Sequence, residues 1–338
     1  MTPDLASQVV VNGRFLARRV TGVERYGREI LCHIGNKCQL ESTRSQGWRG
    51  HAWEQLILPA RLKQDSVLWS PANTGPLVVR DQALTIHDLS PLEHPEWFRA
   101  GFAAWYHLFL PMLAKRVKKV FTPSEYVKQK VMRRFGIRNV IVTPNGVDRS
   151  IFHPDAKQTR FDLPECYILF VGTLEPRKNL NLLLQAWNQI KDDFKDTWLI
   201  IAGVSGSVFR TIRVRVSDEV ERVHFPGYVD DETLAGLYAN ATLFVLPSKE
   251  EGFGLPVLEA MASGTPVVIS NGGALPEVVG EAGMNFCLSN PDELTNILRE
   301  CLSNSRLRAE LREKGLERAQ AFSWQVTAER VWKNLNEL

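Results

Sequence analysis

Short apolar runs alternate along the chain with stretches in which apolar residues recur at helical spacing. In the second half, continuous apolar runs predict buried strands at residues 167–171, 198–202, 223–225, 243–246 and 266–270. Helical spacing predicts helices at residues 179–190, 231–240 and 255–263. This alternation predicts an α/β fold, in which helices cover both faces of a parallel sheet.

The first half shows the same alternation with weaker signals. Apolar runs predict strands at residues 9–11, 67–69, 83–86, 120–121 and 140–142. Helices are expected at residues 23–32 and 97–117, and we expect Pro111 to kink or split the second of them. Residues 35–55 are polar and allow no assignment.

Glycine and proline mark a boundary between the two halves. The segment 144–154 contains Pro144, Gly146 and Pro154. It predicts a first lobe at 1–150, a second at 151–320 and a final helix within 321–338. Two α/β lobes predict a ligand cleft between them.

The composition is that of a globular protein, with 44% hydrophobic and 23% charged residues in a chain of 338. No apolar run reaches the roughly 18 residues that a membrane-spanning helix needs. Residues 1–11 lack the basic start and apolar core of a signal peptide. The five cysteines are scattered, which indicates a reducing compartment without a disulfide framework. We therefore expect a cytoplasmic protein.

The net charge of +3 is unevenly distributed, because residues 1–150 are basic and residues 151–338 are acidic. One region combines basic and aromatic side chains. The basic ones are Lys115, Arg116, Lys118, Lys119, Lys128, Lys130, Arg133 and Arg134, and the aromatic ones are Trp97, Phe98, Phe102, Trp105, Tyr106 and Phe109. The pattern fits either a peripheral membrane contact or a helix with an aromatic core face and a solvated basic face. Since only the basic lobe favours nucleic acid, we expect no nucleic-acid partner.

The segment Glu251-Gly-Phe-Gly-Leu-Pro-Val-Leu-Glu259 follows a predicted strand and enters a helix. Glu251 is therefore expected at the carboxyl end of a strand, where parallel sheets bind ligands. The glycines bring backbone amides close to a ligand, and the helix N-terminus favours an anion. One carboxylate can contact a reacting group while the other accepts hydrogen bonds from a diol. Two such glutamates are otherwise ordinary solvated charges, but the strand–loop–helix context favours a binding site.

Arg177 and Lys178 follow the strand predicted at 167–171 and precede a helix. Two cations at this place suit a pyrophosphate. A basic dipeptide is usually a solvated pair of charges, and its position at the carboxyl edge of the sheet is what favours a function.

Gly22 and His87 are weaker candidates in the first half. Gly22 precedes a predicted helix, where a backbone amide can approach a phosphate. His87 follows a predicted strand and can contact substrate or transfer a proton. Either residue is by itself more typical of an ordinary structural role.

Several cofactor and metal motifs are absent. The sequence has no Gly-x4-Gly-Lys-Ser/Thr phosphate loop, no His-Glu-x-x-His and no Asp-x-Asp pair that could hold a metal on a diphosphate. We therefore expect neither metal nor cofactor. Arg177, Lys178 and helix dipoles would have to stabilise a leaving nucleotide diphosphate.

Taken together, these segments resemble a known family. The chain is similar to the retaining glycosyltransferases of family 4, in their mannosyltransferase-like branch. The resemblance covers nearly the whole chain and is strongest at 170–283. The matching segments are Val171-Gly-Thr-Leu-Glu-Pro-Arg-Lys-Asn179, Pro247-Ser-Lys-Glu-Glu-Gly-Phe-Gly-Leu-Pro-Val-Leu-Glu-Ala-Met-Ala-Ser-Gly-Thr-Pro266, Leu275-Pro-Glu277, Thr21-Gly-Val-Glu-Arg-Tyr26, His87-Asp88, Thr122-Pro-Ser124 and Pro144-Asn-Gly-Val-Asp148.

The resemblance implies a GT-B fold, with two Rossmann-like lobes facing a cleft and a C-terminal helix that returns to the first lobe. It implies that Arg177 and Lys178 hold the diphosphate of a nucleotide sugar and that Glu259 binds the ribose. The implied partners of the sugar are Glu251, Gly252, Phe253, Gly254 and Leu255. Gly22 would approach the diphosphate from the first lobe, and His87 would lie near the anomeric carbon.

The resemblance also implies the substrates. The segment from His87 to Trp97 looks like the mannosyltransferase branch, so GDP-mannose is the first expected donor and a UDP-sugar the second. The expected acceptor is a polysaccharide or a lipid-linked oligosaccharide at the inner face of the cytoplasmic membrane. Two alternatives stay open, namely a non-catalytic sugar-nucleotide-binding or scaffold protein and a GT-B synthase that uses a soluble sugar or sugar phosphate.

Overall fold

The computed structural model describes residues 9–156, 160–205, 208–209 and 221–338. The chain forms two units, each built around a sheet of six parallel strands, which confirms the α/β fold. The first unit contains the chain up to Glu93, Gly101–Gly146 and Ser323–Leu338. The second contains His94–Ala100 and Val147–Phe322. The sequence placed the boundaries at 150 and 320, and it did not predict that His94–Ala100 belongs to the second unit.

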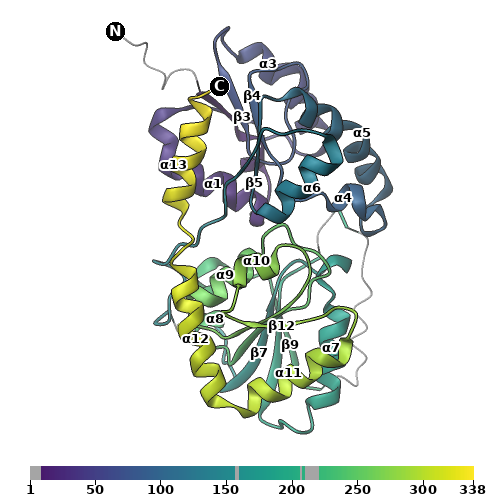
Figure 1. Cartoon of the computed structure of the whole chain (residues 1–338), viewed down its shortest axis with the longest axis vertical. Helices are drawn as coiled ribbons and strands as arrows, with labels where there is room; N and C mark the ends of the chain where they lie inside the picture. The colour runs from purple at the N-terminus through teal and green to yellow at the C-terminus, as the bar shows by residue number, and fades with distance from the viewer. Residues whose placement is uncertain (1–8, 157–159, 206–207, 210–220) are drawn as a thin grey trace. The chain divides into compact units, whose positions relative to one another are not determined.

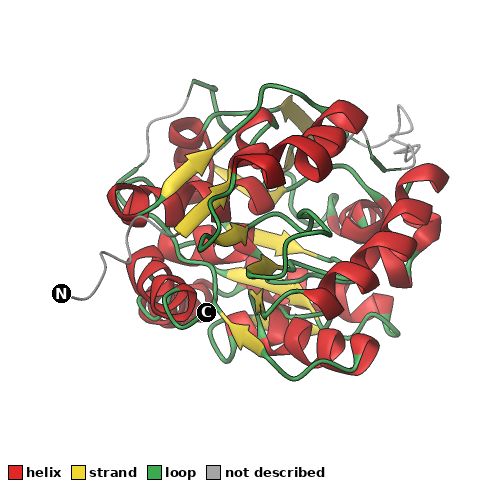
Figure 2. Cartoon of the chain, turned by 90° about the horizontal axis from the view of Figure 1, so that it is seen from above, coloured by secondary structure: helices red, strands yellow, loops and turns green. Residues whose placement is uncertain are grey.

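The sheet of the first unit has the strand order β2-β1-β3-β4-β5-β6. The strands are β1 (Val9–Asn12), β2 (Gln39–Glu41), β3 (Val67–Ser70), β4 (Gln82–Thr85), β5 (Lys119–Thr122) and β6 (Val140–Val142). All were expected except β2, a partly exposed edge strand whose three residues contain no apolar run. Figure 2 shows the strands lying between helices.

The helices of the first unit cover both faces of this sheet (Figure 1). They are α1 (Gly22–Ile34), α2 (Gly47–Ala52), α3 (Leu58–Arg61), α4 (Ser90–Glu93), α5 (Ala100–Arg116), α6 (Glu125–Phe135) and α13 (Trp324–Leu335). A π-helix at Trp53–Ile57 joins α2 to α3, so residues 47–61 are one continuous helical segment. The last helix, α13, packs against α1.

Pro111 does not split α5, so the prediction of a split is wrong. The helix runs without interruption from Ala100 to Arg116. A proline inside a helix removes one backbone hydrogen bond. The residues on both sides of it, including Phe109, Leu110 and Leu113, are buried against β4, β5 and α6. Because this packing exists on both sides of the proline, it offsets the loss of one hydrogen bond.

The sheet of the second unit has the order β12-β11-β10-β7-β8-β9. The strands are β7 (Cys166–Val171), β8 (Thr197–Ala202), β9 (Val223–Gly227), β10 (Leu243–Leu246), β11 (Val267–Ser270) and β12 (Met284–Phe286). The helices are α7 (Leu180–Ile190), α8 (Asp231–Asn240), α9 (Leu255–Ala262), α10 (Leu275–Val279), α11 (Pro291–Ser303) and α12 (Ser305–Ala319). Contacts join α7 to α11, and α9 to α8 and α12, which gives a helical layer on each face of the sheet (Figure 1).

The order of the strands decides where the candidate site forms. β10 pairs in parallel with β7, with Leu243 opposite Ile168 and Phe244 opposite Leu169. The loops that follow these two strands therefore leave the same edge of the sheet side by side. They are the loops that carry Arg177, Lys178 and Glu251.

No helix in the described parts of the chain is long and apolar enough to cross a membrane.

Candidate functional site

A tight turn holds Arg177 and Lys178 at the carboxyl edge of the second sheet. After β7 the chain forms a 3₁₀ turn at Pro176–Lys178 and then enters α7 through Asn179, whose φ of 55° is left-handed. Asparagine tolerates this conformation better than most residues. The backbone N–H of Lys249, in the loop after β10, donates to the carbonyl of Arg177 at 2.8 Å. This bond joins the two loops.

The backbone of Glu251 is fixed by a second loop, after β11. Gly273 has a φ of 67°, and a Cβ at this position would lie 2.3 Å from the carbonyl oxygen of Glu251. The N–H of Ala274 donates to the same oxygen at 2.9 Å. Only glycine fits so close to another backbone with this φ, so Glu251 is held by three loops rather than by one.

The side chains of Glu251, Arg177 and Lys178 are in direct contact. Lys178 Nζ lies 2.6 Å from Glu251 Oε1, and Arg177 Nη1 lies 2.8 Å from Oε2. The hydroxyl of Ser248 donates to Oε1 at 2.6 Å. The carboxylate of Glu251 is buried. It accepts hydrogen bonds from the side chains of Arg177, Lys178 and Ser248.

Arg177 also contacts a second buried carboxylate. Its Nε and Nη2 lie 2.9 and 2.7 Å from Glu175 Oε1, and Nη1 donates to the carbonyl of Glu250 at 3.2 Å. The other oxygen of Glu175, Oε2, is buried and has no hydrogen-bond partner among the described residues. We call Glu175, Arg177, Lys178 and Glu251 the ion-pair cluster.

The pKa values of the two carboxyl groups in the ion-pair cluster are shifted in opposite directions. Burial alone would raise the pKa of Glu251, but the charges of Arg177 and Lys178 and their hydrogen bonds lower it to about 2. Burial raises the pKa of Glu175, although Arg177 and Lys178 act against the shift. The surroundings of Glu251 thus favour its charged form, whereas burial disfavours the charged form of Glu175.

Glu259 lies in the second turn of α9 and is buried. Its Oε2 accepts a hydrogen bond from the hydroxyl of Tyr238, on α8, at 3.2 Å. This contact orients one carboxylate oxygen.

The glycine-rich segment between the two glutamates forms the start of α9. Gly254 has a φ of 99°, and Leu255 is the first residue of the helix. Phe253 is buried, with its ring 5.7 Å from that of Phe322 in an edge-to-face contact. The Phe253 side chain therefore belongs to the core of the second unit.

In the first unit, Gly22 is the first residue of α1 and is exposed. A Cβ placed on it would meet no atom within 4 Å. Glycine is therefore not required here by the packing of the first unit.

His87 lies just after β4 and is buried. One ring nitrogen, Nε2, is 2.7 Å from the carbonyl oxygen of Pro71, so it carries the proton and donates it. The ring packs edge-on against Tyr26, with 5.0 Å between centroids. Burial lowers the pKa of His87, and the hydrogen bond to Pro71 acts against this shift. The imidazole is accordingly neutral, and its Nδ1 carries a lone pair.

Three residues of the site were missed by the sequence analysis. Glu175 and Ser248 lie within the segments that carried the family resemblance, and the signal for Glu175 was its place two residues before Arg177. His94 had no such signal. Its Nε2 lies 3.3 Å from Glu250, and its ring stacks on Trp97 at 3.9 Å.

The aromatic residues of the basic region belong to the core. Trp97, Phe98, Tyr106 and Phe109 are buried, and Phe102 and Trp105 pack against a core cluster. Lys119 is buried too, with its Nζ 2.9 Å from Glu337. Of the two interpretations of this region, the aromatic core face is confirmed.

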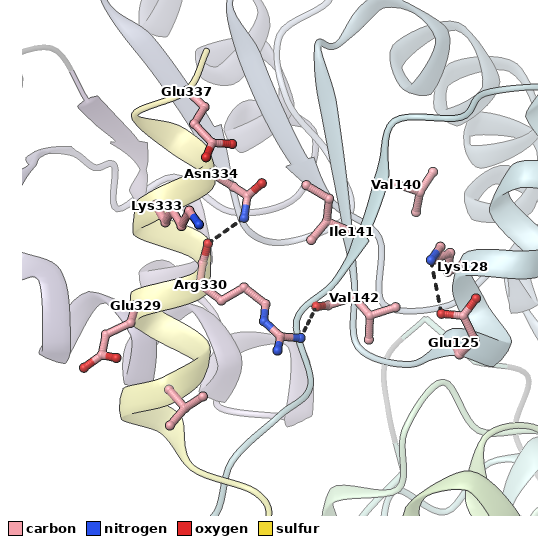
Figure 3. Close-up of a pocket in the computed structure, with 11 residues that line it drawn as sticks. Glu125, Lys128, Val140, Ile141, Val142, Glu329, Arg330, Lys333, Asn334 and Glu337 are labelled. Carbon is pink, nitrogen blue, oxygen red and sulfur yellow. Dashed lines mark hydrogen bonds and ion pairs between the residues drawn. The ribbon is translucent and has the colours of Figure 1, made fainter.

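A groove of 790 Å³ lies on the first unit between α6, β6 and α13 (Figure 3). Arg330 of α13 points toward β6 and donates to the carbonyl of Val142 at 3.0 Å. None of the predicted site residues lines this groove.

The sequence matches two family models. Residues 152–318 match the model described as glycosyl transferases group 1, and residues 79–151 match glycosyltransferase family 4. The O-antigen chain mannosyltransferase B of Escherichia coli is 33% identical over 71% of this chain and 66% of its own length. The MMP alpha-(1->4)-mannosyltransferase of Mycolicibacterium hassiacum is 32% identical over 69% of this chain and 58% of its own length. The matches thus span less than two thirds of these relatives.

Solved structures show the same fold. Sucrose-phosphate synthase from Thermosynechococcus elongatus superposes with a TM-score of 0.76 at 19% identity, over 98% of both chains. HepE from Anabaena, solved with UDP and glucose, superposes with a TM-score of 0.74 at 18% identity, over 98% of this chain and 100% of its own. The chain belongs to the glycosyltransferases of family 4 and has their GT-B fold.

Proposed function

We propose that the protein is a retaining glycosyltransferase that moves a hexose, with mannose as the first candidate, from a nucleotide-diphosphate sugar to a glycan. The observation that carries this proposal is the buried contact of Arg177 and Lys178 with Glu251 at the adjacent carboxyl ends of β7 and β10. Two cations at that edge of a parallel sheet suit a diphosphate.

The carboxylate of Glu251 contacts both cations, and Glu175 contacts Arg177 as well. Arg177 directs its Nε, Nη1 and Nη2 groups to Glu175, Glu250 and Glu251. The ammonium group of Lys178 has three N–H donors. Among the described side chains, Glu251 accepts a hydrogen bond from it. We therefore assign the main contact with the diphosphate to Lys178, and to Arg177 a positioning role that the sequence did not distinguish.

The sugar and the nucleoside would be held by the segment that begins α9. Glu251, with the backbone groups of Gly252, Gly254 and Leu255, would bind the hydroxyl groups of the sugar. Glu259 would bind the ribose diol through the carboxylate that Tyr238 orients. Helix α9 would direct its positive N-terminal end toward the negative donor.

We propose that Gly22 and His87, in the first unit, also contact the donor. Gly22 leaves the N-terminus of α1 open to a phosphate oxygen. His87 would contact the transferred sugar near its anomeric carbon as a neutral imidazole.

The reaction breaks the bond between the anomeric carbon and the phosphate oxygen and forms a bond to an acceptor oxygen on the same face of the sugar. The departing phosphate oxygen takes the proton of the acceptor hydroxyl. Lys178 and the α9 dipole stabilise the negative charge that develops on the diphosphate, and we propose that no metal is required.

We propose GDP-mannose as the first donor and a UDP-sugar as the second, with a polysaccharide or lipid-linked oligosaccharide as acceptor at the inner face of the cytoplasmic membrane. The names of the two relatives, both mannosyltransferases, support the sugar. One of them acts on an O-antigen chain by its name, which supports a glycan acceptor.

A transfer assay in the presence of a chelator tests the function. The protein is incubated with GDP-mannose or UDP-glucose, a mannose-ended oligosaccharide and EDTA, and the free nucleotide diphosphate and the anomeric proton of the product are followed by NMR. We expect transfer with the α-configuration of the donor retained. An inverted product contradicts the retaining mechanism, and transfer that requires added magnesium contradicts the cation-based one. Donor binding without transfer to any acceptor favours a non-catalytic protein.

Replacing Glu259 with Ala should weaken donor binding by roughly ten- to a hundredfold, because hydrogen bonds to a charged group are worth about 1.5–3 kcal/mol. Calorimetric titration with GDP-mannose measures the affinity. Glu300→Ala, an exposed glutamate on α11, is the matched control and should bind like the wild type. Equal affinity of the Glu259 variant and the wild type would remove Glu259 from the site.

A further inference from the structure

Several large apolar side chains of the first unit are exposed to solvent. Trp48 is 75% exposed, Leu56 74%, Val78 66% and Leu108 65%. Ile57 and Met112 are exposed as well. Scattered apolar residues are normal on protein surfaces, whereas a contiguous group with a polar rim marks an interaction site.

Side-chain contacts show that the elements carrying these residues adjoin one another. The ring of His51, on the helical segment 47–61, lies 5.3 Å from that of Trp105 on α5. Gln55, on the same segment, bonds to the carbonyl of Gly75 at 2.9 Å and to the N–H of Leu77 at 3.0 Å. Arg116, at the end of α5, donates to the carbonyl of Leu77 at 2.7 Å. The segment 47–61, the loop 75–80 and α5 therefore form one surface, which we call the apolar–basic surface.

The charges on this surface are predominantly positive, although Arg61 is paired with Glu41 of β2 at 3.0 Å. Residues 47–63, 75–80 and 100–116 contain a single carboxylate, Glu54, which is buried beside Arg14. The exposed basic residues of the same stretches are Arg49, Arg61, Lys63, Arg80, Lys115 and Arg116. The guanidinium of Arg49 also lies over the ring of Trp48, at 5.6 Å. Exposed tryptophan, leucine and isoleucine among basic residues are typical of helices that bind at the interface of an anionic bilayer.

We propose that the apolar–basic surface docks the protein on an anionic lipid bilayer, with Trp48, Leu56, Ile57, Val78, Leu108 and Met112 entering the interface. A second copy of this chain is disfavoured, because a symmetric contact would bring two surfaces of the same charge together without acidic partners. The surface differs from the basic and aromatic region that the sequence singled out, whose aromatic side chains are in the core. The inference rests on the proposed function only in that a lipid-linked acceptor explains why a glycosyltransferase would bind a membrane.

Cosedimentation with lipid vesicles tests this surface, using the full chain and no donor. Vesicles of phosphatidylcholine alone are compared with vesicles that contain about one third phosphatidylglycerol. We expect the wild type to partition roughly tenfold more strongly onto the anionic vesicles. Leu56→Ser combined with Ile57→Ser should lower this partition at least about tenfold, because it removes two large apolar side chains from the interface. Val326→Ser removes an apolar side chain that is 57% exposed on α13 of the same unit, and it should leave partition unchanged.

The proposal is overturned if the wild type does not bind anionic vesicles, or if the Leu56/Ile57 double variant binds them like the wild type. It is also overturned if light scattering finds a dimer that the double variant converts to a monomer, because the surface then binds a second copy. Titration of both proteins with GDP-mannose, without lipid, separates this proposal from the proposed function. Equal donor affinity with lost vesicle binding supports the surface. Vesicle binding as expected without any donor binding leaves the surface standing and contradicts the glycosyltransferase proposal.

Discussion

Replacing Glu251 with Gln lowers the free energy of unfolding of the second unit by about 3 kcal/mol at pH 7. The carboxylate of Glu251 is the shared partner of Arg177 and Lys178, at 2.8 and 2.6 Å. The amide of Gln keeps the shape but removes the negative charge, which leaves the buried Lys178 and the half-buried Arg177 with one carboxylate, Glu175. Removing one partner of a buried ion pair is costly because the other remains desolvated.

This loss depends on pH in a defined direction. The pKa of Glu251 is about 2 in the folded protein, below its ordinary value of 4.5. A lowered pKa contributes stability above the unfolded pKa, and the contribution is lost as the pH falls through the folded one. The stability difference between the wild type and Glu251→Gln should therefore be full at pH 7 and shrink between about pH 4.5 and pH 2. Chemical denaturation at a series of pH values measures it.

Glu175→Gln is the matched control for this prediction. Glu175 belongs to the same ion-pair cluster and is equally buried, but its pKa is raised by burial, so its charge is not favoured by folding. Its replacement by a neutral isostere should cost much less than that of Glu251 at pH 7. Equal losses for the two variants, or a Glu251 effect that stays constant down to low pH, would contradict the charge assignment in the cluster.

Replacing Lys178 with Ala should lower kcat/KM for the nucleotide sugar by about a hundredfold, which corresponds to about 2.7 kcal/mol of transition-state stabilisation. Lys178 is the cation with donors available for a diphosphate, and its stem packs over Gly172, with Nζ 3.8 Å from where a Cβ would be. Steady-state kinetics with GDP-mannose measure the effect. Lys314→Ala, an exposed lysine on α12, should turn over like the wild type.

Arg177→Ala should behave differently from Lys178→Ala. Because Arg177 bonds to Glu175, Glu250 and Glu251, its loss leaves the buried Glu175 without its ion-pair partner and Glu251 with Lys178 as its one cation among the described residues, and stability should fall by about 3–5 kcal/mol. Arg177→Lys keeps the charge and gives a folded variant if the alanine variant fails to fold. The assignment is contradicted if Lys178→Ala loses stability but keeps its turnover while Arg177→Lys keeps its stability but loses turnover. Arg177 would then contact the diphosphate, and Lys178 would have the positioning role.

The parallel strands could be predicted because each is a run of apolar residues buried on both faces, as at Tyr167 to Val171 and Leu243 to Leu246. β2 could not, because its side chains are largely exposed and its backbone pairing with β1 leaves no trace in the local sequence. Pro111 was misleading for a related reason. Its helix is maintained by packing with residues far along the chain, which local propensity does not contain.

Some residues of the candidate site could also be predicted from the sequence, whereas their contacts could not. Arg177, Lys178 and Glu251 could be singled out from their positions after strands. Their contact depends on β10 lying beside β7, which is a property of strand order rather than of spacing. The pairing of His94 with Glu250 joins residues that are distant in the sequence and carries no local signal. The roles of Gly22 and His87 remain predictions.

Thermal unfolding with a panel of nucleotide sugars tests whether the second unit binds a nucleotide sugar through Lys178. The panel contains GDP-mannose, GDP-fucose, UDP-glucose, UDP-N-acetylglucosamine and the free nucleotides. A ligand at a hundred times its dissociation constant adds about 2.7 kcal/mol of stability. We predict that compounds of one base, guanine first, raise the unfolding temperature of the wild type, and that Lys178→Ala loses most of that rise. No shift with any compound, or an equal shift in the variant, would contradict the account.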